Sequence, residues 1–262
     1  KRIIDSQKLF VETEETLLSE LKLSSWRPTE ENKAVKRFSK SFEVSGRLDA
    51  EYYQPKFDEL MIKLSATKHK SLGSIVSLKK SIEPGSDAYL TEGIPFIRVS
   101  DISRYGITLP EHHLDRKEYD IEELKPKKDT ILFSKDGSVG IAYKVEKDED
   151  VITSSALLHL TITDKEVLPD YLTLVLNSKL TQMQAERDAG GSIIQHWRPD
   201  EIKRVLVPIL PMDKQKELVK QIKESFKLRH ESVKLIEIAK RAVEIAIEQD
   251  ETVGLNFIDK NI

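Results

Sequence analysis

The sequence predicts an α+β fold, in which a domain with a mixed or antiparallel sheet is flanked by an N-terminal helix and a long C-terminal coiled-coil helix. Two observations carry this prediction. Near both ends of the chain, apolar residues recur at intervals of three and four, which is typical of helices. Between about residues 71 and 167, short apolar or alternating runs are separated by Gly, Pro, Asp and Ser, which is typical of strands.

The N-terminal part of the chain is expected to be helical and then irregular. A first helix is predicted over residues 1–25, and Pro28 ends it because the residue before a proline disfavours the α conformation. A polar and basic linker follows over 26–50. A second, short helical pattern covers 51–65.

The central region contains the predicted strands. Asp136 and Gly137 lie between two of them and predict a hairpin turn. Helical spacing returns over 169–187, a glycine pair then breaks the chain, and Pro199 begins a short helical turn. The expected strands are 74–78, 94–99, 130–134, 140–145, 156–162 and a last extended piece at 205–208.

Residues 213–250 carry the clearest pattern in the sequence. Seven of nine positions at strict 3-4 spacing are apolar, and Arg229 and Lys240 interrupt them. At about 1.5 Å per residue, such a helix is a rod of about 57 Å. Its stripe needs a covering helix, and the N-terminal helix is shorter, so self-association or docking of another helical subunit is expected. The predicted interface residues are Val219, Ile222, Phe226, Val233, Ile236, Val243 and Ile247.

These boundaries divide the chain into an N-terminal spacer helix over 1–25, a domain over 26–212, and a long helix with its tail over 213–262. The 262 residues include 42 basic and 45 acidic side chains, for a formal charge of −3. Residues 66–212 alone hold 20 basic and 23 acidic residues, so binding to nucleic acid through a high overall positive charge is excluded.

The composition also limits the chemistry and the compartment. The chain has no cysteine, which excludes disulfides, thiolate metal sites and a cysteine nucleophile. No apolar run approaches the roughly 18 residues that span a membrane, and no signal peptide opens the chain. A cytoplasmic protein without a membrane partner is therefore expected.

Signatures of catalysis are missing from the sequence. There is no phosphate-binding glycine loop, no dinucleotide fingerprint and no nucleophile elbow. The six histidines form no metal-binding pair, so neither a metal nor a cofactor is expected. His159 lies within an apolar strand and is interpreted as a hydrogen-bonded core residue.

One pattern imitates a metal-dependent nuclease. Asp170, followed by Glu201 and Lys203, resembles a constellation in which two carboxylates hold Mg²⁺ and a lysine orients water. Here each acid follows a proline at a predicted helix start. The helix dipole alone explains acids at such positions, so a nuclease site is the weaker interpretation.

The order of the segments resembles the target-recognition half of a specificity subunit from type I restriction–modification systems. In this family a recognition domain is followed by a long helix, and the pair is repeated. The heptads after Gln215 are similar to that helix. The other segments that carry the resemblance are 47–56, 72–76, 93–102, 131–140, 190–196 and 207–211.

The resemblance implies a division of labour. A specificity subunit reads double-stranded DNA, while separate subunits carry the methyltransferase and restriction activities, so this chain is not expected to be an enzyme. Because the chain begins at Lys1 and its first helix resembles a spacer, we expect either the second half of a longer subunit or a half-length subunit that dimerises.

Contacts with DNA are expected at polar residues near turns, and each group has a structural alternative. Lys135 could sit in a plain hairpin, Arg98 could form a structural ion pair, and Gln195 adjoins Trp197, which suggests packing. The candidates are Lys79, Lys80, Arg98, Ser100, Arg104, Tyr105, Lys135, Asp136, Gly137, Ser138, Gly190, Gly191, Gln195, His196 and Arg198.

Other functions stay open on the sequence alone. The chain could be the recognition end of a fused restriction and methyltransferase enzyme, a metal-dependent nuclease, or a helix-tethered scaffold domain without a role on DNA. A methyltransferase motif upstream in the full-length gene would favour the fusion, whereas a second recognition domain there would favour the type I subunit.

Overall fold

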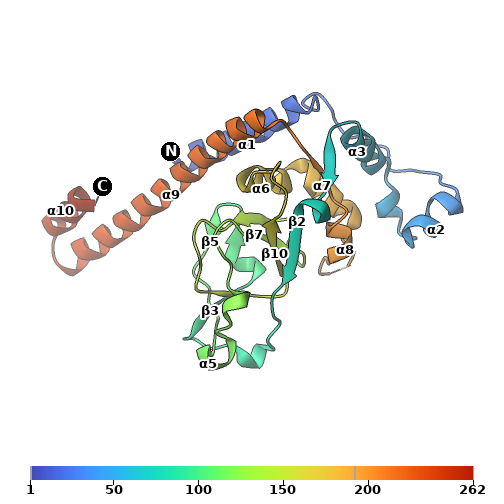
Figure 1. Ribbon diagram of the computed structural model, residues 1–262. Coiled ribbons are helices and arrows are strands. Elements are labelled where there is room, and N and C mark those ends of the chain that lie inside the picture. The colour runs from blue at the N-terminus through green and yellow to red at the C-terminus, as the bar shows by residue number, and fades with distance from the viewer. Residues whose placement is uncertain (1, 192, 262) are drawn as a thin grey trace. The chain divides into compact units, whose positions relative to one another are not determined.

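Figure 1 presents the computed structural model, which describes residues 2–191 and 193–261. The chain forms two compact units, one made of Lys1–Leu17 with Glu217–Ile262 and the other of Leu18–Lys216. Helices combine with antiparallel and mixed sheets, and a long helix lies near the C-terminus. The predicted α+β class is confirmed.

The longer helices follow the expected order. They are α1 (Arg2–Glu20), α3 (Pro55–Ser65), α6 (Pro169–Asn177), α7 (Lys179–Asp188), α9 (Met212–Glu248) and α10 (Glu251–Asn261). Single helical turns are α2 (Phe42–Ser45), α4 (Leu72–Ile75), α5 (Arg116–Tyr119) and α8 (Pro199–Ile202), with 3₁₀ turns at Phe38–Lys40, Ala50–Tyr53, Ser86–Ala88, Val99–Asp101 and Glu122–Leu124. None of the helices in the described part of the chain is long and apolar enough to cross a membrane.

The strands of the unit Leu18–Lys216 form small sheets. The largest is antiparallel, in the order β2 (Val76–Lys80), β10 (Leu157–Ile162), β7 (Ile131–Ser134) and β8 (Ala142–Lys144). A mixed sheet joins β6 (His113–Leu114), β3 (Ile94–Ile97) and β9 (Ile152–Thr153), with β3 parallel to β9. Two pairs complete the set, β1 (His69–Ser71) with β11 (Leu206–Pro208) and β4 (Ile102–Ser103) with β5 (Gly106–Ile107).

Helix α6 fixes the start of β8 against the core. It is buried almost throughout, and its Asn177 donates through Nδ2 to the Ala142 carbonyl at 2.7 Å while its Oδ1 accepts from the Ala142 N–H at 3.2 Å. Strand β8 is at the edge of its sheet, so its outer side has no neighbouring strand. The Asn177 amide instead bonds both the N–H and the carbonyl of Ala142. The connection between β7 and β8 therefore begins and ends on buried, hydrogen-bonded backbone.

Several titratable side chains are buried in this unit, among them His159 and Lys144. His159 on β10 is only 6% exposed and shares a hydrogen bond of 2.8 Å with the Thr153 hydroxyl, so the predicted core histidine is confirmed. Burial lowers the pKa of His159 to about 4, and the positive charge of Lys79 adds to this shift. Lys144 is also buried, and its ammonium lies 3.2 Å from Asp170.

The unit that contains most of α9 is a helical rod. Helix α1 packs on α9 through reciprocal bonds in which Ser6 Oγ donates to the Ser225 carbonyl and Ser225 Oγ to the Ser6 carbonyl, both at 2.8 Å. Phe10 stacks on Phe226, with ring centroids 6.4 Å apart. Farther along α9, α10 folds back so closely that a Cβ on Gly254 would lie 2.7 Å from the Ala242 carbonyl oxygen.

The apolar stripe of α9 is covered only in part. Ile222 is buried and Val219 and Phe226 are half-buried, whereas the other four predicted interface residues, Val233, Ile236, Val243 and Ile247, are exposed by 44%, 40%, 59% and 81%. The buried apolar residues in the second half of α9 are instead Ile238, Ala242 and Ile245. At 100° per residue these three lie on the face opposite Ile222, while the exposed four continue the Ile222 face.

Several predicted boundaries were wrong. The first helix ends at Glu20 rather than 25, and Lys22 adopts a left-handed conformation with φ of 58° just after it. Residues 74–78 are not one strand, because Leu72–Ile75 form a helical turn held by bonds from the Leu72 and Gly73 N–H groups to the carbonyls of Val205 and Lys203. Strand β2 begins only at Val76.

The helix predicted over 169–187 is two helices. Ser178 between them is extended, with φ of −75° and ψ of 160°, and its hydroxyl donates to the Val175 carbonyl at 2.6 Å. This local bond competes with continuation of the helix. The short strands β1, β4, β5, β6 and β9 were also missed, because pieces of two or three residues are too short to show a period. Helix α10, at Glu251–Asn261, was missed as well, since the sequence analysis assigned these residues to the tail of the long helix.

Candidate nucleic-acid interface

Two of the predicted residue groups form one surface. The connection between β7 and β8, residues 135–141, lies beside the segment that follows α7. The Gly137 N–H donates to the Gln195 carbonyl at 2.9 Å, and the Trp197 N–H donates to the Lys135 carbonyl at 2.7 Å. Gly190 and His196 exchange two further backbone bonds of 3.1 and 2.6 Å. The predicted hairpin is present, but its connection is longer than a two-residue turn.

Asp136 joins the side chains of the two loops. Its Oδ1 lies 2.9 Å from His196 Nδ1, and its Oδ2 accepts from the Lys135 ammonium. The side chains of Lys135 and Asp136 are 14% and 21% exposed, whereas that of His196 is 63% exposed. The cluster therefore has a shielded carboxylate at its centre and an imidazole ring at its rim.

Glycines set the backbone of both loops. Gly137 has a φ of 70° and open space where a Cβ would be, so the backbone there is accessible to a ligand. Gly191 has a φ of 119°, and a Cβ at this position would lie 2.0 Å from the Ile194 carbonyl oxygen. Gly191 is thus required by conformation and by space.

Trp197 anchors the second loop. Its side chain is 1% exposed and its ring lies 5.7 Å from that of Phe133, so the packing role suspected from the sequence is confirmed for Trp197. Gln195 and His196, the two residues before it, are exposed. Gln195 is therefore held beside a buried anchor with its own side chain at the surface, as base reading requires.

The group around Arg98 approaches the same surface from another side. Arg104 and Tyr105, in the turn between β4 and β5, line a cavity of about 270 Å³ together with Gly140 and Ile141 of the β7–β8 connection. Ser100 is exposed, and its hydroxyl donates to Asp101 at 3.1 Å. The turn residues thus border the loop that carries Lys135.

Arg98 itself has an unusual environment. Its backbone N–H donates to the Asp101 carboxylate at 2.8 Å, and no ion pair of its guanidinium is present among residues 2–191 and 193–261. Its Nε is buried without a hydrogen-bond partner in this described part of the chain. The structural ion pair considered for Arg98 is therefore not formed here.

Lys79 and Lys80 belong to a different element from the two loops. Both are exposed on β2, where Lys79 pairs in register with His159, and the Lys79 ammonium donates to the Glu123 carbonyl. Among the described residues no hydrogen bond or ion pair links either lysine to 135–141 or 193–197. Both lie on β2, an edge strand of the four-stranded sheet.

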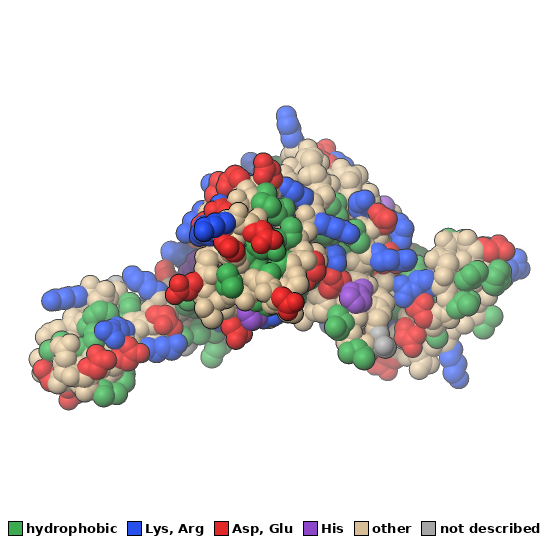
Figure 2. Space-filling model, turned by 90° about the horizontal axis from the view of Figure 1, so that it is seen from below, with side chains coloured by type: hydrophobic (Ala, Val, Ile, Leu, Met, Phe, Trp, Pro, Cys, Tyr) green, Lys and Arg blue, Asp and Glu red, His purple; other side chains and the backbone are tan. Residues whose placement is uncertain are grey.

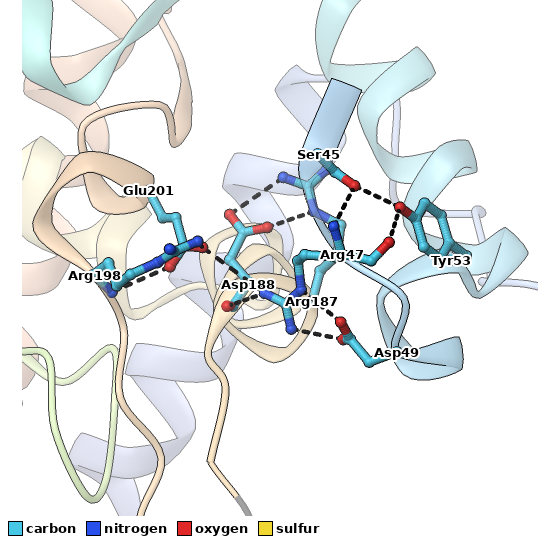
Figure 3. Close-up of polar contacts among 8 residues, drawn as sticks. All are labelled: Ser45, Arg47, Asp49, Tyr53, Arg187, Asp188, Arg198 and Glu201. Atoms are coloured by element: carbon cyan, nitrogen blue, oxygen red, sulfur yellow. Dashed lines mark hydrogen bonds and ion pairs between the residues drawn. The ribbon is translucent and has the colours of Figure 1, made fainter. Parts of the chain in front are cut away.

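A second polar network lies at the base of the loop that follows α7, and the sequence analysis did not identify it as a site (Figure 3). The Arg47 guanidinium forms a bidentate pair with Asp49, at 2.9 and 2.6 Å, and donates to the Asp188 carbonyl at 2.6 Å. It also lies 3.8 Å from the Glu201 carboxylate and 4.7 Å from the ring of Tyr52.

The same network connects both ends of the loop. Arg187 pairs with Asp188 at 2.7 Å at the end of α7, and Arg198 pairs with Glu201 at the start of α8. The hydrogen bond from Arg47 lowers the pKa of Asp49 and raises that of Arg47 itself. Arg198, a predicted DNA contact, is exposed by 68% but already has this acidic partner. The ends of α7 and α8 are therefore held together by buried charges.

The residues that imitate a nuclease site have separate partners. Asp170 lies against Lys144, Glu201 against Arg47 and Arg198, and Lys203 pairs with Asp200 at 3.1 Å. Within the described ranges, no group of three or more His, Asp or Glu side chains is arranged to hold a metal ion. Asp170 lies in the first turn of the buried helix α6 and Glu201 in that of the short helix α8, as expected from Pro169 and Pro199.

Known proteins resemble this chain in sequence and in fold. It is 24% identical over 236 residues to the type I restriction enzyme EcoBI specificity subunit of Escherichia coli, which covers 84% of this chain and 49% of that protein. The chain thus spans about half the length of the curated relative that it matches. Its fold is similar to that of the S subunit of a type I restriction–modification system from M. genitalium, with a TM-score of 0.51, 18% identity, and coverage of 69% of this chain and 44% of that one.

A similar fold occurs in the type IIG restriction endonuclease BpuSI, with a TM-score of 0.50, 11% identity, and coverage of 71% of this chain and 30% of that one. At such identities these two structures show a shared fold alone. The family model described as type I restriction modification DNA specificity domain matches residues 65–239, which include both loops and the first part of α9. The chain belongs to the family of type I restriction modification DNA specificity domains.

Proposed function

We propose that this chain reads one half-site of a double-stranded DNA sequence as the specificity module of a type I restriction–modification complex. The observation that carries the proposal is that residues 135–141 and residues 190, 191 and 193–197 form one polar surface within the matched region. Polar side chains on loops fixed by buried anchors are suited to reading base edges. Lys135, Gln195 and His196 are the central contacts, with Arg98, Ser100, Arg104 and Tyr105 at the border.

The chain acts without chemistry of its own. Separate methyltransferase and restriction subunits dock on it and modify or cut the DNA, and the complex works in the cytoplasm. The pairing of Asp170 with Lys144 and of Glu201 with Arg47 supports this division, because both acids are occupied by cations. The purified chain should neither cut nor methylate DNA in the presence of Mg²⁺ and S-adenosylmethionine. Cleavage that is lost on Asp170→Ala or Glu201→Ala would contradict this.

The isolated chain should bind DNA weakly. Acidic and basic side chains are mixed over the face seen in Figure 2, and residues 66–212 carry slightly more acids than bases. Phosphate neutralisation dominates non-specific affinity, so we expect a Kd of about 1 μM or weaker at physiological salt. Fluorescence anisotropy of the chain alone and of the assembled complex tests this. Nanomolar, sequence-specific binding by the chain alone would overturn the division of labour.

Lys135 offers a test of the site itself. In the complex, Lys135→Ala should weaken all sequences alike and reduce the salt slope by about one if Lys135 meets a phosphate. If it meets a base, the loss should be about 1–3 kcal/mol and confined to one position. Lys203→Ala, which removes an equal charge from the residue that follows α8, is the control. An unchanged binding profile for Lys135→Ala would remove Lys135 from the site.

The exposed stripe of α9 supports association with a second helix. Val233, Ile236, Val243 and Ile247 continue the face that α1 covers at Ile222, so the same kind of helix–helix seam extends beyond the end of α1. We place a second copy of this chain or a helix of a partner subunit there. Sedimentation should show association that Ile236→Asp abolishes. Lys227→Gln, which changes the charge equally on the opposite face, should preserve it, and a wild-type chain that stays monomeric at high concentration would contradict the seam.

A further inference from the structure

We propose that Asp136 does not contact DNA but is a positioning residue, which holds Lys135 and His196 so that the two loops read DNA as one unit. This inference rests on the proposed function and deepens it, because it changes the role of one candidate residue and assigns a chemical group to another. It begins from the arrangement in which one carboxylate meets a cation from its own loop and a ring from the neighbouring loop.

The position of the carboxylate argues against direct reading. Asp136 could accept from the amino group of a cytosine, but each of its oxygens already faces a nitrogen, Oδ1 that of His196 and Oδ2 that of Lys135. A bare carboxylate at a DNA surface would also be repelled by the phosphates. At 21% exposure the Asp136 side chain lies behind that of His196, which is 63% exposed.

The backbone reinforces the link that Asp136 makes. Asp136 and His196 are partners in an antiparallel bridge, and the bonds from Gly137 to Gln195 and from Trp197 to Lys135 flank it. Two loops joined by backbone bonds on both sides of one side-chain pair have little freedom to move separately. The side-chain pair then controls only the orientation of the Lys135 ammonium and of the His196 ring.

The orientation of His196 defines what it can read. Its Nδ1 faces the Asp136 carboxylate, so in the neutral ring Nδ1 carries the proton and donates it. The other nitrogen, Nε2, is then a hydrogen-bond acceptor on an exposed ring. In the major groove an acceptor pairs with the exocyclic amino group of adenine or cytosine. His196 is therefore assigned an amino group as its partner, with Asp136 fixing the tautomer.

The test uses the assembled complex and its preferred site, determined by selection from a random DNA pool. In the wild-type complex, replacement of one adenine or cytosine of the half-site by purine or 2-pyrimidinone, which lack the amino group, should weaken binding roughly tenfold at a single position. Asp136→Ala should weaken binding to the unmodified site by a similar factor and should be insensitive to that replacement. Asp136→Asn, which keeps an oxygen for His196, should lie between the two.

A double-mutant cycle separates positioning from general structural damage. In the Lys135→Ala background, which removes the other group that Asp136 holds, the complex with both Asp136→Ala and His196→Ala should bind no more weakly than the one with His196→Ala alone. Asp200→Ala, which removes the same charge from an exposed pair on α8, should leave site preference and the cycle unchanged. Thermal unfolding of each variant checks that the loops remain on a folded domain, and Asp136→Asn serves if the alanine variant unfolds.

The outcomes distinguish this inference from the proposed function. Additive losses in the cycle, or equal sensitivity of wild type and Asp136→Ala to the amino group, would overturn the role of Asp136 while leaving the chain a DNA-reading module. A wild-type complex that shows no sequence preference would overturn the proposed function and this inference with it. A loss in Asp136→Ala that is equal for all sequences and that persists in the Lys135→Ala background would likewise assign Asp136 a purely structural role.

Discussion

Two charged clusters lie near the loop after α7, one around Arg47 and Glu201 at its base and one around Asp136 and His196 at its rim. They contain similar residues but differ in what those residues do. At the base of the loop, Arg47 is 17% exposed and its acidic partner Glu201 is 5% exposed. At the rim, Asp136 is 21% exposed but its partner His196 is 63% exposed. A buried charge is costly without its partner, so the base cluster holds the fold, whereas the rim cluster keeps a group available for a ligand. Burial, more than residue type, separates the supporting charges from those that we propose to read DNA.

The largest effect on stability is expected at the base. Arg47→Ala would leave the Asp188 carbonyl without its donor, Asp49 without its bidentate partner and the buried Glu201 with Arg198 alone. Removal of one member of a buried charge cluster costs about 3–5 kcal/mol. Urea unfolding of the chain measures this loss. The matched control is Lys203→Ala, in the exposed pair with Asp200, which should cost less than about 1 kcal/mol. If the two variants lost equal stability, burial would not be what gives the Arg47 cluster its role in holding the fold.

The second effect is a pH dependence of stability that comes from the buried His159. Because burial holds the pKa of His159 at about 4, the unfolded chain takes up a proton near pH 6.5 while the folded chain does not. Stability should therefore fall as the pH drops from about 6.5 to about 4, by up to roughly 3 kcal/mol, with no contribution from His159 above that window. His159→Gln should flatten this part of the pH profile. An unchanged profile in urea titrations would show that another group causes the slope.

The smallest effect on stability is expected at the rim, where function should change instead. Gln195 is exposed, so Gln195→Ala should alter the free energy of unfolding by no more than about 0.5 kcal/mol. If Gln195 pairs with an adenine edge, discrimination at one base position of the complex should fall by about 1–3 kcal/mol. Ile193→Ala, at an exposed neighbour, should change neither quantity. A change in salt slope with unchanged base preference would instead indicate a phosphate contact.

Local patterns predicted most of the fold. The helix expected over 213–250 spans Met212–Glu248, because a stripe sustained over many turns outweighs errors at its ends. The strands at 131–134 and 157–162 were located by their apolar runs. The same periodicity did not reveal which side of α9 would be buried, since the exposed face at Ile236 and the buried face at Ile238 are both apolar.

The site was predicted in separate pieces. Lys135, Gln195 and His196 were all selected for their place near turns, but their union depends on backbone bonds between segments far apart in sequence. The network of Arg47 was missed for the same reason, because its bond to Asp188 spans 141 residues. The segment 47–56 had been identified as part of the family resemblance, which gave its position along the chain but not its side-chain partners.

The conformation of Gly191 has a practical consequence for engineering altered sequence preference. Any side chain there would collide with the Ile194 carbonyl, so libraries that randomise this position would consist mostly of misfolded members. Diversity confined to Gln195 and His196, with Gly191 and Trp197 held constant, samples new surface chemistry on an unchanged backbone. In a deep mutational scan, position 191 should therefore tolerate almost no substitution. Nearly all substitutions at position 195 should still give folded, expressed protein, and the variants should differ only in which DNA sequences they bind.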